Sequence, residues 1–232
     1  MPRYSLGKLF GGMALFILVS EGIAFAAEPT DNKQLLFNRS HQAGIRLGVW
    51  VNQGGSPPSE DTVLNFETNF HNANFYFEGY FAYRLHSHFM MEFSVGIVNR
   101  GSVTFIEGNA TNVGNVLVHP ILLQLRFYPL SSLAPKVQPY LVGGGGLYYG
   151  RRSVQFTKTS GVYYFGLDEQ TGTSFNYTFG GGVDWPIGRT IGLEANLRYM
   201  SINFSKGLQT VRDYDALVFT IGVKYLSLPK KR

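Results

Sequence analysis

Apolar and polar residues alternate along most of this chain with a period of two. Eight segments keep one continuous apolar face: 43–52, 73–85, 89–99, 116–128, 137–150, 173–185, 190–201 and 215–226. Strict alternation is typical of β-strands, and we find no convincing helical stripe of apolar residues after Ala27. An apolar face of about ten residues matches a tilted strand that crosses a bilayer. The pattern therefore predicts eight membrane-crossing β-strands.

The connections between these segments alternate in length. The short ones are 86–88, 129–136 and 186–189, and the long ones are 53–72, 100–115, 151–172 and 202–214. Short turns on one side and long loops on the other are the arrangement of bacterial outer-membrane barrels. A lipid-exposed sheet must also close, because its edge amides find no partner in hydrocarbon. We predict an all-β chain that forms one eight-stranded antiparallel transmembrane β-barrel, with short periplasmic turns and long extracellular loops.

Ring residues gather near the ends of the apolar faces, as in the aromatic girdles of membrane barrels. They are Tyr83, Phe89, Phe127, Tyr149, Phe175, Trp185, Tyr199 and Tyr225. Aromatic residues make up 15 % of the chain and charged residues only 15 %, against about 25 % charged residues in ordinary soluble domains. The alternative is a soluble β-sandwich or lipocalin-like barrel, which would turn its apolar face inward.

The first residues have the features of a secretory signal. Arg3 and Lys8 precede an apolar stretch, and Ala24-Phe25-Ala26 offers a small-x-small cleavage motif. We expect a signal peptide over 1–26 and an outer-membrane barrel domain over 27–232; the alternative for the first segment is a membrane anchor. The chain has no cysteine, so that export exposes no thiol to oxidation.

Two stretches carry a resemblance to a known family. They are Pro120-Ile-Leu-Leu-Gln-Leu-Arg-Phe-Tyr-Pro129 and Gln138-Pro-Tyr-Leu-Val-Gly-Gly-Gly-Gly-Leu-Tyr-Tyr149, and Gly180-Gly-Gly-Val-Asp184 fits the same pattern. The chain resembles the small outer-membrane barrels of the outer-membrane protein W and protein A N-terminal type. Many such barrels end on an aromatic residue that the assembly machinery reads, whereas here seven residues follow Tyr225. The resemblance implies the barrel class, not a particular task.

The polar face of the predicted barrel carries charges of both signs near the periplasmic turns. We expect these charges to lie in the lumen: Arg84, Glu92, Arg126, Asp184, Glu194 and Lys224. An eight-stranded barrel leaves an interior just wide enough for side chains, and buried charges need partners. The pattern favours a structural plug of salt bridges over an ion-selective gate.

The extracellular half of the lumen has a different composition. Trp50, Tyr76, Tyr80 and Tyr148 are predicted to point inward, beside Gly144, Gly146, Gly180 and Gly182. Glycines that give the rings room explain this pattern better than a pocket for a small apolar ligand. Pro120 cannot donate to a strand ladder, and in a closed barrel such a residue can open a local gap in the wall towards lipid, so that Pro120 is a candidate for a lateral gap. The family resemblance implies lateral release of apolar molecules at such a gap.

Basic residues recur at the predicted extracellular rim. We single out Arg100, Arg151 and Arg152 as lipopolysaccharide contacts, because arginine binds phosphate in a forked geometry. Solvated loop charge is the simpler interpretation of the same residues.

The sequence offers no convincing catalytic or cofactor motif. Enzymes of this size in the outer membrane pair a histidine with a serine and a carboxylate, but His86-Ser87-His88 falls in a predicted periplasmic turn. We expect no enzymatic activity, no cofactor and no metal site. The formal charge of +5 is spread out, which gives no reason to expect nucleic acid as a partner.

We therefore expect a non-enzymatic protein of the bacterial outer membrane, either structural or a narrow conduit or binding protein for small apolar molecules. The first alternative is a surface-interaction protein that acts through its extracellular loops, and a lipid A-modifying enzyme is less favoured. The expected partners are outer-membrane lipid, lipopolysaccharide and the assembly machinery, with a monomer favoured.

Overall fold

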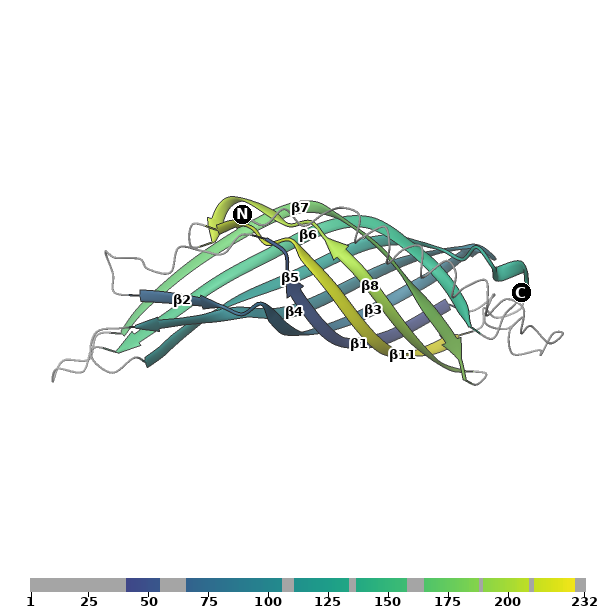
Figure 1. Ribbon diagram of the computed structural model, residues 1–232, viewed down its shortest axis with the longest axis horizontal. Helices are drawn as coiled ribbons and strands as arrows, with labels where there is room; N and C mark the ends of the chain where they lie inside the picture. Colours follow the sequence, from purple (N-terminus) through teal and green to yellow (C-terminus); the bar gives the residue numbers. More distant parts are fainter. Residues whose placement is uncertain are drawn as a thin grey trace.

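The computed structural model is a closed antiparallel barrel of strongly tilted strands (Figure 1). It describes residues 41–54, 66–105, 111–133, 137–157, 165–187, 190–208 and 211–227. The expected signal segment 1–26 lies outside these residues. The strands are β1 (His41–Asn52), β2 (Phe66–Phe70), β3 (Ala73–His86), β4 (Phe89–Phe105), β5 (Thr111–Phe127), β6 (Gln138–Thr157), β7 (Phe165–Pro186), β8 (Ile191–Met200), β9 (Asn203–Leu208), β10 (Val211–Asp213) and β11 (Ala216–Ser227), with a 3-10 turn at Ser131–Leu133.

Eight of these strands form the wall, in the order β1, β3, β4, β5, β6, β7, β8 and β11. Each strand pairs with the next, and β11 pairs with β1 from His41↔Ser227 to Asn52↔Ala216, which closes the ring. β2 pairs with the end of β4, and β9 pairs with β10 in a separate hairpin. The predicted eight-stranded barrel is confirmed.

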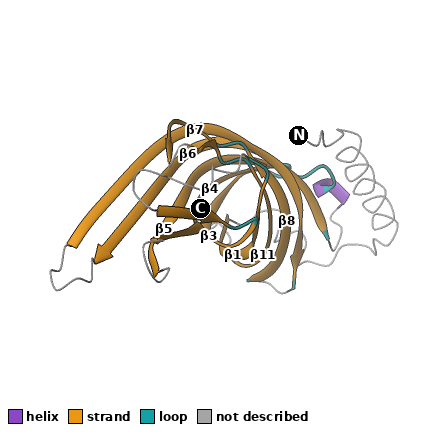
Figure 2. Ribbon diagram, turned by 60° about the vertical axis from the view of Figure 1, so that its left-hand side comes forward, coloured by secondary structure: helices purple, strands orange, loops and turns teal. Residues whose placement is uncertain are grey.

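The two ends of the barrel differ. At the turn end, two residues separate β3 from β4 and four separate β7 from β8, whereas ten residues, with the 3-10 turn among them, separate β5 from β6. We call the opposite end the loop end. There, strands β4, β5, β6 and β7 extend well beyond the other wall strands (Figures 1 and 2). β6 and β7 are 20 and 22 residues long and remain paired out to Thr157↔Phe165.

The predicted loops 100–115 and 151–172 are therefore mostly strand. In these strands the alternation of apolar and polar residues ends where their outer faces are no longer apolar. The hydrogen-bonded pairing of the strands continues beyond that point. Polar side chains such as Gln170 and Thr171 are compatible with a hairpin in water. Because they interrupt the alternation of apolar and polar residues, the sequence pattern does not predict the ends of these strands.

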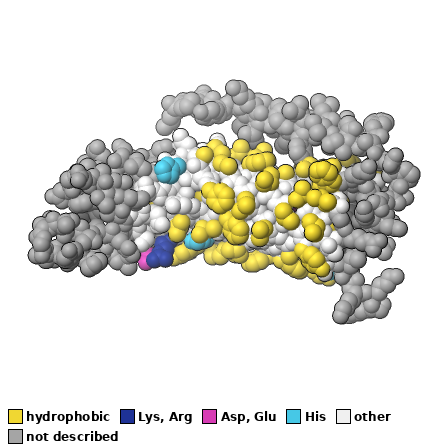
Figure 3. Space-filling model, turned by 90° about the horizontal axis from the view of Figure 1, so that it is seen from below, with side chains coloured by type: hydrophobic (Ala, Val, Ile, Leu, Met, Phe, Trp, Pro, Cys, Tyr) yellow, Lys and Arg dark blue, Asp and Glu magenta, His cyan; other side chains and the backbone are white. Residues whose placement is uncertain are grey.

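The faces of the wall follow the predicted alternation. Leu123 is 54 % exposed on the outside, whereas its neighbour Gln124 is 2 % exposed in the lumen. Apolar side chains spread over the outer surface, and charged ones are confined to one end of the view in Figure 3. A soluble β-protein would turn these apolar chains inward, so that the soluble alternative is wrong. No helix among the described residues has the length and hydropathy to cross a membrane.

Candidate functional site in the barrel lumen

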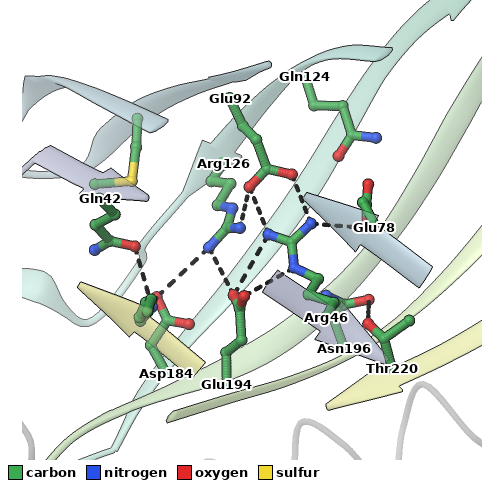
Figure 4. A network of polar contacts seen from close by, with 12 residues as sticks. Gln42, Arg46, Glu78, Glu92, Gln124, Arg126, Asp184, Glu194, Asn196 and Thr220 are labelled. Carbon is green, nitrogen blue, oxygen red and sulfur yellow. Dashed lines mark hydrogen bonds and ion pairs between the residues drawn. The ribbon is translucent and has the colours of Figure 1, made fainter. Parts of the chain in front are cut away.

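Buried side chains divide the lumen into three layers. An apolar cluster at the turn end contains Tyr80, Ala82, Met90, Tyr128, Tyr140, Val142 and Leu226. A second apolar cluster at the loop end, the loop-end cluster, contains Trp50, Tyr76, Val98, Val103, Val116, Val118, Leu122, Tyr148, Met200, Ile202, Phe204, Tyr214, Ala216 and Val218. Charged side chains lie between the two clusters and form the ion network (Figure 4).

Arg46 of β1 is the hub of the ion network. Its guanidinium contacts three carboxylates, from Glu78 of β3 at 3.0 Å, Glu92 of β4 at 2.7 Å and Glu194 of β8 at 2.8 Å. Both Nη atoms of Arg46 donate to Glu92, at 2.9 and 2.7 Å. Such charge-assisted, forked hydrogen bonds are the strong kind, and here they join strands on different sides of the lumen.

Three further cations complete the network. Arg126 of β5 pairs with Glu92, with Glu194 at 3.2 Å and with Asp184 at 3.7 Å. Lys224 of β11 contacts Asp184 at 2.6 Å. On the other side of the hub, Arg198 of β8 pairs with Glu78. The carboxylate of Asp184 also accepts a hydrogen bond of 2.7 Å from the Tyr128 hydroxyl.

The ion network is electrically balanced and spans nearly the whole ring. Arg46, Arg126, Arg198 and Lys224 oppose Glu78, Glu92, Asp184 and Glu194, which gives four charges of each sign from seven of the eight wall strands. The eighth strand, β6, supplies the Tyr140 ring, which lies 4.7 Å from the Arg126 guanidinium carbon. Opposite charges in contact offset the cost of burial, and side chains from strands around the ring meet across the lumen at this level.

The structure brings five of the six sequence-predicted lumen charges into this network. The sixth, Arg84, is buried closer to the turn end, where its Nη1 donates to the Ser87 carbonyl and its guanidinium lies 4.7 Å from the Tyr128 ring.

Sequence reasoning missed three members of the network, Arg46, Glu78 and Arg198. All three alternate with apolar neighbours, so that the pattern already placed them on the polar face. The predicted set covers only charges close to the periplasmic turns, whereas these three lie deeper in the lumen. Their pairing depends on strand register, since Arg46 lies directly opposite Glu78. On the other side Gly222 separates Arg46 from Glu194, and a Cβ there would crowd both side chains.

The four rings predicted to point inward are all buried in the lumen, but only Trp50, Tyr76 and Tyr148 lie in the loop-end cluster. The prediction that Tyr80 lies in the extracellular half is wrong, because its ring belongs to the turn-end cluster. The inward glycines give room, as the simpler interpretation expects. A Cβ on Gly96 would overlap the Tyr76 hydroxyl, and one on Gly182 would lie 2.6 Å from the end of the Tyr140 ring. Cβ atoms on Gly144, Gly146 and Gly180 would overlap the backbone of neighbouring strands. These glycines thus permit close packing of rings and strands.

Pro120 stands beside an interruption of the wall. The β4–β5 ladder runs as far as Val95↔Ile121 and resumes in the same register at Val98↔Val118. Gly96 and Ile97 therefore have no ladder partner on β5, opposite a proline that has no N–H to donate. Towards β6 the ladder continues through Pro120↔Tyr148. From inside, the Tyr76 hydroxyl covers Gly96, so that this thin part of the wall borders the loop-end cluster.

The three rim arginines lie in different environments. Arg151 points outward, with its side chain 43 % exposed, and contacts Glu169 at 2.8 Å. Arg100 and Arg152 are only 1 % and 3 % exposed. The side chains of Arg100 and Arg152 are therefore buried away from the surface that a lipid headgroup could contact.

The His86-Ser87-His88 turn holds the serine between two imidazoles. The Ser87 hydroxyl lies 3.2 Å from His86 Nδ1 and 3.0 Å from His88 Nδ1. Within the described part of the chain neither histidine contacts a carboxylate, the third group of a nucleophilic triad. These contacts arise between neighbours in a tight turn.

One apolar hollow of about 420 Å³ lies on the outside of the wall, not in the lumen. Ile45, Leu47, Trp185, Ala195 and Ile221 line it on β1, β7, β8 and β11. In a bilayer this surface meets acyl chains, so that it is part of the lipid-facing wall.

Comparison with known proteins identifies the wall architecture. Residues 22–226 match the model of the outer membrane protein beta-barrel domain. Among solved structures, OprG from Pseudomonas aeruginosa is 14 % identical with a TM-score of 0.52, over 82 % of this chain and 96 % of that one. Neisserial surface protein A is 17 % identical with a TM-score of 0.49, over 80 % and 95 % of the two chains. No curated protein sequence matches this chain. The likeness to OprG is one of fold.

Proposed function

Because the chain belongs to the outer membrane protein β-barrel family, we propose that it admits small apolar molecules to the bacterial outer membrane through the loop-end half of its lumen. The molecules enter from the extracellular side, occupy the space of the loop-end cluster and leave sideways into the bilayer at Pro120. The protein acts without catalysis. The observation that carries this proposal is a buried apolar cluster in the lumen that ends on the ion network and borders an interrupted wall.

The ion network supports a sideways route over a passage through the barrel. An apolar molecule that moved on towards the turn end would have to break contacts between Arg46 or Arg126 and their carboxylates, without offering replacement hydrogen bonds. Leaving such buried charges unpaired is costly.

The wall beside Pro120 supports the exit. Elsewhere a molecule that left the lumen would have to break hydrogen bonds between strands, which find no substitute in hydrocarbon. Between Gly96 and Pro120 the ladder is already interrupted, and the Tyr76 ring covers the place from inside. A rotation of that ring would join the loop-end cluster to the lipid.

Replacing Pro120 should close the exit. Pro120→Ala restores an N–H that can donate to Gly96, and the β4–β5 ladder becomes continuous. We expect the uptake of N-phenyl-1-naphthylamine, a small apolar dye that fluoresces in lipid, to rise several-fold when intact cells express the wild-type chain. Expression of Pro120→Ala should return the initial rate close to that of cells without the protein.

Pro139→Ala is the matched control. Pro139 also lies in a wall strand, but its ladder with β7 is continuous through Pro139↔Val183. This variant should keep the wild-type uptake rate. If Pro120→Ala transports as well as wild type, the sideways exit is wrong, and if the wild-type chain does not raise uptake at all, the transport function is wrong.

A second function, recognition at the cell surface, is favoured by the length of the central hairpins. β6 and β7 have about twice the ~9–11 residues needed to cross the bilayer, so that much of this hairpin projects beyond the wall. An exposed ion pair, Arg151–Glu169, lies on it. Of the three rim arginines, only Arg151 is exposed enough to remain a proposed lipopolysaccharide contact.

The assembled protein lies among outer-membrane lipid and lipopolysaccharide. Since β1 and β11 close the wall within one chain, the eight wall strands that the structure describes leave no open wall edge, which supports a monomer. For recognition by the assembly machinery we propose the last strand, β11, where the Tyr225 ring is exposed on the outside. Removal of residues 1–26 as a signal peptide completes the proposed path to the membrane.

A further inference from the structure

Arg100 is a buried cation that the ion network does not include. It is 1 % exposed and belongs to β4 at the loop end of the lumen. The β4–β5 register shifts between Asn99 and Gly101, so that Arg100 is the extra residue of a β-bulge. The Asn99 side chain accepts a hydrogen bond of 3.2 Å from the Gly101 N–H beside it. Arg100 continues the inward alternation of Gly96 and Val98, and the bulge then turns Val103 to the lumen side as well, so that the guanidinium lies against the loop-end cluster.

The surroundings of Arg100 are aromatic rather than acidic. Its guanidinium carbon lies 6.0 Å from the Trp50 ring and 5.7 Å from the Tyr214 ring. Burial raises the pKa of the Tyr214 hydroxyl, so that this ring stays neutral and provides no counter-charge. Within the part of the chain that the structure describes, no group accepts a hydrogen bond from Nε or Nη1 of Arg100. This contrasts with Arg46, whose three donor nitrogens all contact carboxylates.

Other donors in the same cluster share this property. The Trp50 indole nitrogen and the Tyr76 and Tyr148 hydroxyls are buried, and none has a hydrogen-bond partner among the described residues. Buried polar groups in folded proteins are nearly always paired, so that a cluster of unpaired donors indicates an acceptor that binds from outside the chain. A forked guanidinium beside apolar walls fits a carboxylate attached to an apolar body.

We propose that the loop-end cluster binds small apolar carboxylates, with the carboxylate on Arg100 and the hydrocarbon among the aliphatic side chains below it. This inference rests on the proposed function and narrows its substrate class. Trp50 and Tyr214 flank the head group, while Val98, Val118 and Leu122 surround the tail. The ligand supplies the acceptor that Arg100 lacks.

Trp50 gives a direct measure of binding. The chain has two tryptophans, and the other, Trp185, faces lipid at 54 % exposure, where any dissolved quencher would reach it. In a Trp185→Phe background, folded protein in phosphatidylcholine vesicles is titrated with 8-bromooctanoate or with 8-bromooctan-1-ol, whose bromine quenches tryptophan on contact. We expect the acid to quench Trp50 at a concentration at least tenfold below that of the alcohol.

Substitutions at Arg100 test whether this residue causes the preference for the acid over the alcohol. Arg100→Gln should abolish the tenfold advantage of the acid, and Arg100→Lys, which keeps the charge without the fork, should retain part of it. Arg151→Gln is the matched control, since it removes an arginine at the same end of the barrel whose side chain faces outward. The mobility of unheated protein on gels verifies that each variant is folded.

The outcomes separate this inference from the proposed function. Equal saturable quenching by acid and alcohol would overturn the carboxylate preference and leave the uptake of apolar molecules standing. An acid preference that survives Arg100→Gln would overturn the assignment to Arg100. Absence of quenching by either probe would contradict both the inference and the proposed function.

Discussion

Replacing Arg46 by methionine should destabilise the folded barrel by about 3–5 kcal/mol, the usual cost when one partner of a buried ion pair is removed. Three carboxylates lose their shared cation at once, and the ion network is left with one uncompensated negative charge. Urea titration in lipid vesicles, with the gel mobility of folded and unfolded forms as the signal, measures the loss.

A second substitution tests the charge balance itself. Adding Glu92→Gln to Arg46→Met restores equal numbers of positive and negative charges, so that the double variant should be more stable than Arg46→Met alone. Arg151→Met, which breaks an exposed pair, should cost under about 1 kcal/mol. If Arg46→Met unfolds at the wild-type urea concentration, the network does not hold the barrel together, and additive losses in the double variant would contradict charge compensation.

Much of the barrel could be predicted from the sequence because each strand carries its own signal. Ile45, Leu47 and Val49 alternate with inward residues whatever the other strands do. The faces of the wall therefore followed from period two. The positions at which β4 to β7 end on the loop side could not be predicted in this way, because in water the outer face of a hairpin need not be apolar.

The site was less predictable because it depends on register and on a bulge. Contact between Arg46 and Glu194 requires β11 to lie between them with Gly222 at the crossing point. The Asn99–Gly101 register shift turns Val103 inward, whereas uninterrupted alternation from Ile97 would have sent it outward. Neither feature has a local sequence signal. The position of Pro120 was easier to interpret from the sequence, because the missing N–H of a proline is a property of the residue itself and does not depend on register.

The lipid-facing wall gives the second large effect. Leu123 and Leu85 are both 54 % exposed on the outer surface, but Leu123 lies four residues in from the turn end of β5, whereas Leu85 lies one residue from the turn end of β3. An arginine on the lipid face costs about 2–4 kcal/mol at the bilayer midplane and about 0–1 kcal/mol near the interface. Leu123→Arg should therefore lower the free energy of unfolding in vesicles far more than Leu85→Arg.

This pair of variants keeps chemistry and exposure constant and changes depth alone. Unfolding free energies from urea titration of both variants in the same vesicles make the comparison. In a soluble protein, two equally exposed leucines would tolerate arginine equally well. Equal small losses would thus argue against a membrane-spanning wall, and a larger loss at Leu85 would place the midplane of the bilayer elsewhere along the strands.

Closure of the lumen by the ion network would leave the gap at Pro120 as the exit for anything that enters from the loop end. Current through a planar bilayer that contains the folded full chain tests it most directly. Because side chains from seven strands meet around Arg46 and Arg126, we predict no discrete conductance steps in potassium chloride. Stable, stepwise ion currents through the wild-type protein would contradict the account.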